Sequence, residues 1–347
     1  MEYRHPRQGA TPGGPGSGRV YARLSRLSLP KGEAERVESL LDEQPASVPA
    51  LDVVVDDFEL RGKRLGRLEI EAANRSTGGR DAVREWRLSK FNLVLPEAQL
   101  AATGTWGAGA VPGVRGPSRA AMDFTLTLAD SGALLERLGM GKVLRGGKGS
   151  LAGSVSWPGS PLSPDTAKMS GQIKVAIDAG QFLKASPGAA RLLGVFSLQS
   201  LQRRLLLDFR DLFEEGFLFD NVTGDLMLGA GMATTNNLRM RGPAAVVLME
   251  GEADVERETQ NLRVVVVPEI NAGTASLAYA FINPAIGLGT FLAQYFLSKP
   301  IAEASTREFR VTGPWDDPKV ERVERSKPAG DAPAAAAAAD PPQTTTR

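Results

Sequence analysis

The stretch Gln172-Ile173-Lys174-Val175-Ala176-Ile177-Asp178 decides the fold class of this 347-residue chain. Ile173, Val175 and Ile177 alternate with residues that are polar or small. Side chains of a β-strand point alternately to the two faces of a sheet, so the heptapeptide predicts a strand with one apolar and one solvated face. Strands of that kind are typical of antiparallel sheets.

The same two-residue period recurs along the chain and predicts about twelve to fifteen strands between residues 50 and 313. Other examples of apolar faces are Leu68 and Ile70; Phe124, Leu126 and Leu128; and Val247, Met249, Ala253 and Val255. The connections are short and rich in glycine, as hairpins require. We expect turns at Arg61-Gly62-Lys63, Asn221-Val222-Thr223-Gly224 and Gly229-Ala230-Gly231.

Only a few short helices are expected. Residues 31–44 have the pattern of an exposed amphipathic helix. Asp130 or Ser131 can cap a short helix that ends at Gly139. Two further helices are expected after Pro187 and near Ser200. The chain therefore reads as mainly β.

Three tryptophans follow a glycine and precede turn residues, namely Trp106, Trp157 and Trp315. A glycine in a strand permits a bulge or close approach, and a neighbouring aromatic ring can cover it. We interpret these segments as repeated strand endings.

Composition divides the chain into a core and two tails. Residues 1–18 are rich in glycine and proline and predict a disordered lead-in, and residues 321–347 predict a disordered low-complexity tail. Residues 19–320 are expected to form the folded β domain. No signal peptide or membrane anchor is visible at the start.

The residue inventory restricts the chemistry that this chain can perform. The sequence has no cysteine, and its single histidine, His5, lies in the lead-in. Thiolate metal sites and a cysteine nucleophile are excluded, and a Ser-His-Asp triad is nearly so. With 41 Lys and Arg against 40 Asp and Glu, a phosphate-neutralising nucleic-acid binder is disfavoured. We expect no enzyme, no metal and no cofactor.

Two local patterns carry weak chemical signals. Asp56 and Asp57 are adjacent, and neighbouring carboxylates in a regular strand point to opposite faces, so they would not act on one substrate atom. Gly146, Gly147 and Gly149 are interleaved with basic residues, but no phosphate-loop pattern accompanies them. We interpret this glycine segment as a flexible basic turn.

The most unusual segment is residues 270–298, which carries no formal charge. Asn283-Pro284 divides it into two expected helices, at about 272–282 and 284–297. Three interpretations stay open: a helical hairpin packed on the sheet, a surface that contacts lipid, and a membrane crossing. The apolar residues of the pair are Leu277, Phe281, Leu288, Phe291, Leu292, Tyr295 and Phe296.

Several segments together resemble the C-terminal part of AsmA-like envelope proteins of the YhdP type. The matching stretches are 187–194 (PGAARLLG), 197–201 (SLQSL), 207–209 (LDF), 215–217 (EGF), 242–245 (GPAA), 283–288 (NPAIGL) and 313–318 (GPWDDP). The order and number of these stretches make the resemblance specific, and it covers roughly residues 20–320.

The resemblance implies a long, curved antiparallel sheet that encloses an apolar groove, a β-taco-like shape. It implies non-enzymatic transport of phospholipid between the inner and outer membranes of Gram-negative bacteria, in the periplasm, with this portion toward the outer membrane. We expect acyl chains to contact groove residues and the helical pair to contact membrane lipid. The expected groove residues are Ile173, Val175, Ile177, Phe209, Phe217, Phe219, Val247 and Met249.

Full members of the family are several times longer and begin with an inner-membrane helix. The chain is therefore expected to be a fragment of a longer product or to work with a separate partner. A second hypothesis is a structural or assembly module that binds other envelope proteins through its sheet edges.

Overall fold

The computed structural model describes residues 2–4, 18–33, 48–77, 83–111, 114–140, 143–161, 164–183, 217–243, 245–268, 306–315 and 317–323. Within these ranges, fifteen strands form one sheet. They are β1 (Glu2–Arg4), β2 (Arg19–Leu29), β3 (Ala50–Leu60), β4 (Lys63–Thr77), β5 (Val83–Val94), β6 (Ala98–Val111), β7 (Val114–Leu128), β8 (Leu144–Pro158), β9 (Ser170–Phe182), β10 (Phe217–Gly229), β11 (Met232–Arg241), β12 (Ala245–Asp254), β13 (Thr259–Pro268), β14 (Arg307–Pro314) and β15 (Lys319–Arg322).

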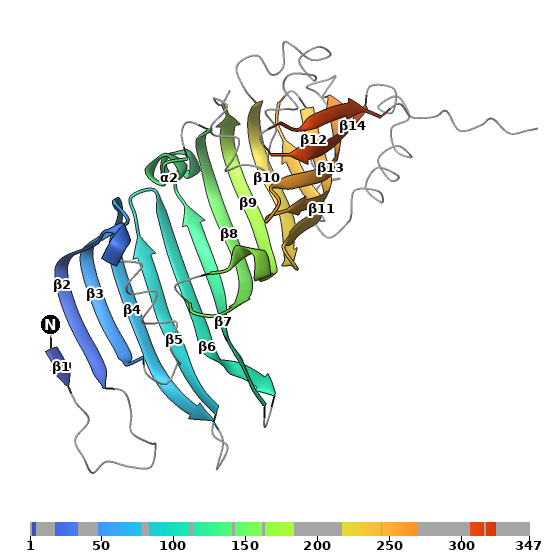
Figure 1. Ribbon diagram of the computed structural model, residues 1–347. Coiled ribbons are helices and arrows are strands. Elements are labelled where there is room, and N and C mark those ends of the chain that lie inside the picture. The colour runs from blue at the N-terminus through green and yellow to red at the C-terminus, as the bar shows by residue number, and fades with distance from the viewer. Residues whose placement is uncertain are drawn as a thin grey trace, which may run out of the picture.

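The order of strands in the sheet is the order of the chain (Figure 1). Every neighbouring pair is antiparallel except β2 and β3, which are parallel. A parallel pair needs a connection that carries the chain back to the starting end, and residues 30–49 provide it. The predicted antiparallel sheet is thus confirmed, and β1 extends it into residues 1–18, which the sequence assigned to the lead-in.

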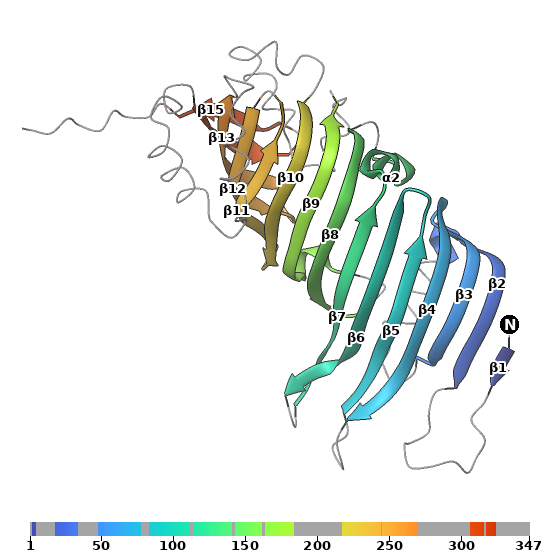
Figure 2. The same ribbon diagram turned by 180° about the vertical axis from the view of Figure 1, so that it is seen from behind.

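The sheet is long, curved and unclosed, as the two opposite views show (Figures 1 and 2). Strands β2 to β9 succeed one another with a gradual twist, and β11 to β14 are strongly turned relative to them. The turn coincides with register shifts between Thr223 and Met227 in β10 and between Thr235 and Leu238 in β11. Bulges add residues to one strand and so bend it.

Two short helices are described beside the sheet. The helix α2 (Ser131–Arg137) begins at the N-cap Asp130, whose side chain accepts a hydrogen bond from the Ala133 N–H, and Gly139 follows it with φ +83°. This is the helix that the sequence predicted. The 3₁₀ turn η2 (Thr166–Lys168) is capped by Asp165. Of the predicted helix 31–44, residues 31–33 are helical and the rest lies outside the described residues.

The predicted turns had mixed outcomes. Arg61-Gly62 and Ala230-Gly231 form the tight turns expected, with positive φ at all four residues. The prediction at residues 221–224 was wrong, because this stretch is the middle of β10. Polar residues and a glycine mimic a turn there, but both neighbouring strands provide backbone partners.

Two further predictions about glycine segments were wrong. Residues 145–149 belong to β8, where Gly146 and Gly147 have positive φ, so they form an irregular strand rather than a free basic turn. Trp106 lies inside β6 rather than at its end, whereas Trp157 and Trp315 do lie at strand ends.

Candidate functional site

Residues that pair across neighbouring strands share a face of the sheet, so the register of the strands defines continuous rows of side chains. Three rows can be followed from β2 to β14 or β15, and together we call them the apolar face. The first row consists of Val20, Leu51, Ala72, Leu88, Gly104, Met122, Val155, Gly171, Leu228, Ala233, Ala253, Gln260 and Gly313.

The other two rows lie beside the first. The second consists of Ala22, Val53, Ile70, Phe91, Ala102, Phe124, Gly153, Ile173 and Leu226, and resumes after the bulges as Thr235, Gly251, Leu262, Val311 and Val320. The third consists of Leu24, Val55, Leu68, Leu93, Leu100, Leu126, Leu151, Val175 and Gly224, and resumes as Leu238, Met249, Val264 and Phe309.

The composition of these rows is the main feature of the site. Every position is apolar or glycine except Thr235 and Gln260. One face of the described sheet therefore presents hydrocarbon from strand to strand over almost its whole width.

The two halves of the apolar face differ in how far they are buried. From β2 to β9 many of its side chains are only half-buried, including Leu51, Leu88, Phe91, Phe124 and Ile173. From β10 to β15 the closed core cluster takes in Leu238, Met249, Val264 and Phe309 of the third row and Leu262, Val311 and Val320 of the second. Core clusters also occur from β2 to β9, but the half-buried side chains packed against them keep part of their hydrocarbon accessible.

The structure places the predicted groove residues in both halves. Ile173, Val175 and Ile177 share one face of β9, where Val175 is buried and the two isoleucines are half-buried. Phe217, Phe219, Val247 and Met249 lie in the closed cluster, each no more than 3 % exposed. Phe209 and the residues chosen on the expected helical pair, 277–296, lie outside the described residues.

The prediction from sequence did not include many of the accessible residues, particularly Leu51, Leu88 and Phe91. The two-residue alternation was present for Phe91, because Phe91 and Leu93 alternate with Lys90 and Asn92. For Leu88 it was obscured, because a register shift between β5 and β6 separates Leu88 from Phe91 and breaks the two-residue period.

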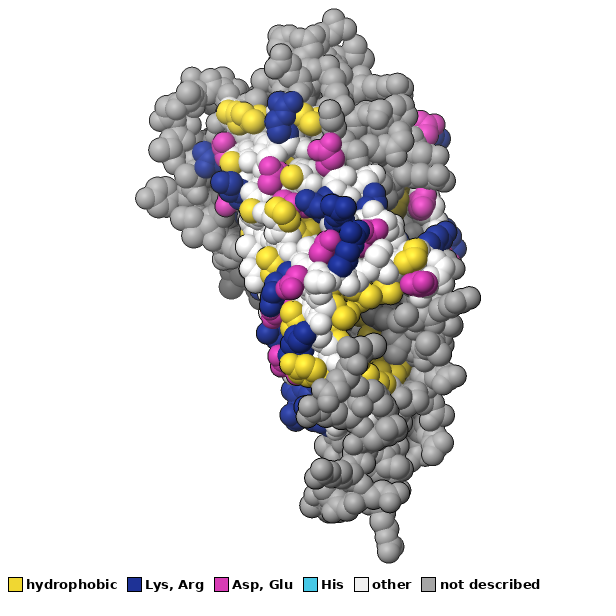
Figure 3. Space-filling view, turned by 90° about the vertical axis from the view of Figure 1, so that its left-hand side faces the viewer, with side chains coloured by type: hydrophobic (Ala, Val, Ile, Leu, Met, Phe, Trp, Pro, Cys, Tyr) yellow, Lys and Arg dark blue, Asp and Glu magenta, His cyan; other side chains and the backbone are white. Residues whose placement is uncertain are grey.

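The opposite face of β2 to β5 carries matched charges. Arg67 contacts Asp56 at 2.6 Å and Glu69 at 3.0 Å, and Lys90 contacts the other oxygen of Glu69 at 2.6 Å. These hydrogen bonds, first that of Lys90 and then that of Arg67, lower the pKa of Glu69 below its ordinary value. In the view from the β2 edge, dark-blue and magenta side chains alternate beside hydrophobic ones (Figure 3).

The pair Asp56 and Asp57 does not follow the regular alternation predicted for it. A register shift lies between Val55 and Phe58, and both of these residues pack into the same core cluster. Both carboxylates therefore lie on the charged side, where Asp56 pairs with Arg67 and Asp57 lies 3.6 Å from Arg26. The prediction of opposite faces was wrong because of this bulge.

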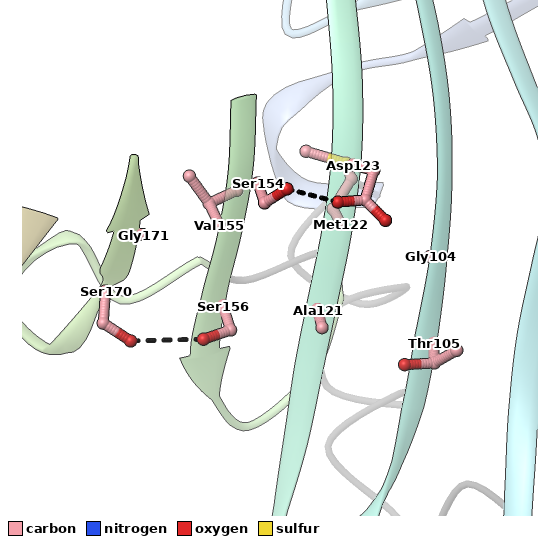
Figure 4. Close-up of a pocket in the computed structure, with 10 residues that line it drawn as sticks. All are labelled: Gly104, Thr105, Ala121, Met122, Asp123, Ser154, Val155, Ser156, Ser170 and Gly171. Atoms are coloured by element: carbon pink, nitrogen blue, oxygen red, sulfur yellow. Dashed lines mark hydrogen bonds between the residues drawn. The ribbon is translucent and has the colours of Figure 1, made fainter. Parts of the chain in front are cut away.

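A shallow hollow of about 290 Å³ lies across β6 to β9 (Figure 4). Its polar side chains are bonded to one another: Ser154 donates to Asp123, Ser156 lies 3.2 Å from Ser170, and Arg119 donates to both of these serines at 2.8 Å. The hydroxyl groups hold adjacent strands together on the face opposite Met122 and Val155. We therefore interpret the polar side chains of this hollow as part of the structure of the sheet.

Two properties of the described residues bear on membranes and metals. No helix in this part of the chain is both long enough and apolar enough to span a bilayer. The same residues contain no group of three or more carboxylate or imidazole side chains placed to hold a metal ion.

Comparisons with known proteins identify the family of this chain. The family model of the YhdP protein matches residues 9–320. The intermembrane phospholipid transporter YhdP of Escherichia coli strain K12 is 34 % identical over 171 residues, which is 49 % of this chain and 13 % of that protein. The chain thus corresponds to a small part of the length of this relative. No solved structure matches significantly. Because the family model covers nearly the whole chain, this protein belongs to the YhdP family.

Proposed function

We propose that this chain is a section of a non-enzymatic conduit for phospholipid between the two membranes of the cell envelope. The acyl chains lie on the apolar face, and along β2 to β9 the headgroups remain in water. The observation that carries the proposal is the continuity of the apolar face, whose three rows cross the described sheet with two polar exceptions. The named activity of the Escherichia coli relative supports the choice of ligand.

The energetics of such a site require only buried hydrocarbon. Each CH₂ group removed from water contributes about 0.8 kcal/mol, so two acyl chains gain roughly 20 kcal/mol before ordering costs. A lipid that moves also needs similar affinity at successive positions. The repetition of leucine, valine, phenylalanine and glycine along the rows from β2 to β9 provides such uniformity, because every position there is apolar or glycine.

The difference in burial suggests where lipid enters. Half-buried side chains from β2 to β9 can accept an acyl chain without disrupting a packed core. Phe217, Phe219, Val247 and Met249 can contact lipid only if the closed cluster opens. We therefore assign the conducting surface to β2–β9, including Ile173 and Ile177. The resemblance of the chain to the C-terminal part of the family supports an orientation in which the closed end lies in the periplasm toward the outer membrane.

Lipid extraction tests the proposal directly. The full chain, purified from a Gram-negative host and shown to be folded by circular dichroism, is expected to carry phospholipid that mass spectrometry detects in the organic extract. A folded protein that carries no phospholipid, and acquires none from vesicles, would contradict the proposal.

Photo-crosslinking tests which face is used. A benzoylphenylalanine at Phe124, half-buried on the apolar face of β7, is expected to crosslink lipid. The matched control is the same residue at Thr125, which is exposed on the other face. Equal crosslinking at both positions would show that lipid binds without regard to the apolar face.

One observation favours a second candidate, an assembly module that binds an envelope protein by strand addition. The described pairing of β1 covers only Arg19–Tyr21 of β2, and the rest of that edge, from Ala22 to Leu29, has no described partner strand on that side. An exposed strand edge can pair with another chain. Recovery of an envelope protein without phospholipid in a pull-down, lost after proline replaces Ser25, would favour this candidate.

A further inference from the structure

The two polar exceptions on the apolar face lie close together in the register. Gln260 lies in the first row on β13, and Thr235 lies in the second row on β11. Only β12 separates their strands, and their partners on β12 are two residues apart, so their backbones are about 12 Å apart. The residues of β12 between them are Gly251 and Ala253.

The amide of Gln260 is buried and makes no hydrogen bond. Its side chain is only 5 % exposed, and neither Oε1 nor Nε2 has a partner. The Thr235 hydroxyl is likewise buried without a partner. Unpaired buried donors and acceptors cost free energy, and native proteins contain few of them. A methionine would fill the same length without that cost, so packing alone does not account for a glutamine here.

The surroundings of the amide are made of small residues. Its cross-strand neighbours are Ala253 and Gly313, and Ala233 follows one strand further. The nearby indole of Trp315 already donates its N–H to the Thr259 carbonyl oxygen at 3.2 Å. The small side chains leave the amide as the main polar group of this part of the face.

We propose that Gln260 and Thr235 bind the polar junction of a phospholipid whose headgroup carries an N–H or O–H donor. The Nε2 group donates to a phosphate or ester oxygen. The Oε1 atom accepts from the ammonium of ethanolamine or the hydroxyl of glycerol. The Thr235 hydroxyl can either donate or accept such a hydrogen bond. A choline headgroup has no such donor and leaves Oε1 unpaired. The inference rests on the proposed function and adds a headgroup preference to it.

The path to this site follows from the first row. From Gln260 the row continues through Ala253, Ala233 and Leu228 to Gly171 on β9. An acyl chain that extends along these residues reaches the half-buried part of the face. Because the amide is covered in the lipid-free protein, the headgroup reaches it only when covering side chains move.

A competition between two lipids tests the proposal. The full chain is loaded from vesicles that contain equal amounts of palmitoyl-oleoyl phosphatidylethanolamine and the corresponding phosphatidylcholine, and the bound lipids are quantified by mass spectrometry. One additional hydrogen bond predicts about fivefold enrichment of the ethanolamine lipid. Gln260→Met is expected to abolish the enrichment, and Thr235→Val to reduce it. The control Gln172→Met changes an exposed glutamine on the other face of β9, and this variant should retain the enrichment of the ethanolamine lipid.

Stability separates recognition from a structural role. Gln260→Met removes an unpaired buried amide and is expected to leave the denaturation midpoint unchanged or higher. A lower midpoint would show that the amide stabilises the lipid-free fold, and would overturn the inference. Equal retention of both lipids by the unmodified chain would also overturn it, while the proposed function would stand. Retention of neither lipid would refute the proposed function itself.

Discussion

At the scale of single residues, glycines on the apolar face allow neighbouring strands to approach where the sheet bends. A Cβ atom at Gly224 in β10 would lie 2.7 Å from the Cα of Leu238 in β11. One at Gly180 would lie 2.4 Å from the ring of Phe219, which covers the glycine. The absence of a side chain at these positions is therefore part of the curvature, as are the bulges beside them.

Replacement of Gly224 by alanine is expected to destabilise the protein by about 1–3 kcal/mol, because the added methyl group meets backbone that cannot easily retreat. Gly229 on the same strand is the matched control, since a Cβ there meets nothing within 4 Å. Gly229→Ala should be neutral or slightly stabilising. Chemical denaturation measures the free energy of unfolding of both variants. Equal changes would show that the close approach of the strands at Gly224 does not contribute to the stability difference.

At the scale of secondary-structure elements, one ion pair attaches α2 to the turn between β5 and β6. Arg137, in the last turn of the helix, donates through Nε and Nη2 to the two carboxylate oxygens of Glu97, which is only 7 % exposed. The hydrogen bond that Arg137 donates to Glu97 raises the pKa of the Arg137 guanidinium. The backbone oxygen of Glu97 also accepts from the N–H groups of Ala129 and Asp130, which precede the helix.

Loss of the arginine leaves a buried carboxylate without its cation, and Arg137→Met is expected to cost about 2–3 kcal/mol of unfolding free energy. Adding Glu97→Leu should recover part of this cost, because the uncompensated charge is then removed. Denaturant titration of the two single variants and the double variant measures the coupling. Strictly additive effects would argue against a direct interaction.

The charged face of β3 to β5 predicts a dependence of stability on pH. Because the pKa of Glu69 is lower in the folded chain than its ordinary value of 4.5, the unfolded chain binds more protons at acidic pH. The stabilisation from Glu69 is present above pH 4.5 and is lost as the pH falls through the folded pKa. Thermal unfolding of the native chain should thus lose stability more steeply below pH 4.5 than that of Glu69→Gln. Parallel curves would contradict this.

At the scale of the whole molecule, the proposed function depends on continuity of the apolar face. The parallel β2–β3 pair and the antiparallel pairs after it keep the rows aligned. At a bulge the register shifts, so that an extra residue of one strand is left out of the pairing and the apolar side chains stay on the same face. Since each strand contributes only a few positions to the apolar face, a single polar substitution in the accessible half interrupts the hydrocarbon surface at that strand.

A carboxylate in this surface is expected to obstruct lipid. Phe91→Asp replaces a half-buried ring of the second row on β5 and should reduce co-purified phospholipid by at least fivefold, because solvating the charge competes with acyl contact. Asn92→Asp introduces the same group on the adjacent residue of the other face. Circular dichroism confirms that both variants are folded, and equal lipid content in the two would count against a conducting face.

The candidate site was predictable only in part. The alternation predicted that Ile173, Val175 and Ile177 share one face of β9, and they do, because regular strands transmit the period of the sequence directly to the sheet. It could not show that Val247 and Met249 would be sealed in a core cluster, since burial depends on what packs over a face. Nor could it show that residues 221–224 would remain in a strand, because their turn-like composition is overridden by backbone partners on both sides.

The sequence by itself determined the strand-rich class, the capped helix at Asp130 and the tight turns at Arg61-Gly62 and Ala230-Gly231, because propensity, capping and left-handed backbone positions are local properties. Tertiary structure alone decided the parallel β2–β3 pair, the bulges and the alignment of the strands into rows. It also placed Thr235 and Gln260 on either side of β12, since strand register joins residues that are distant in the chain.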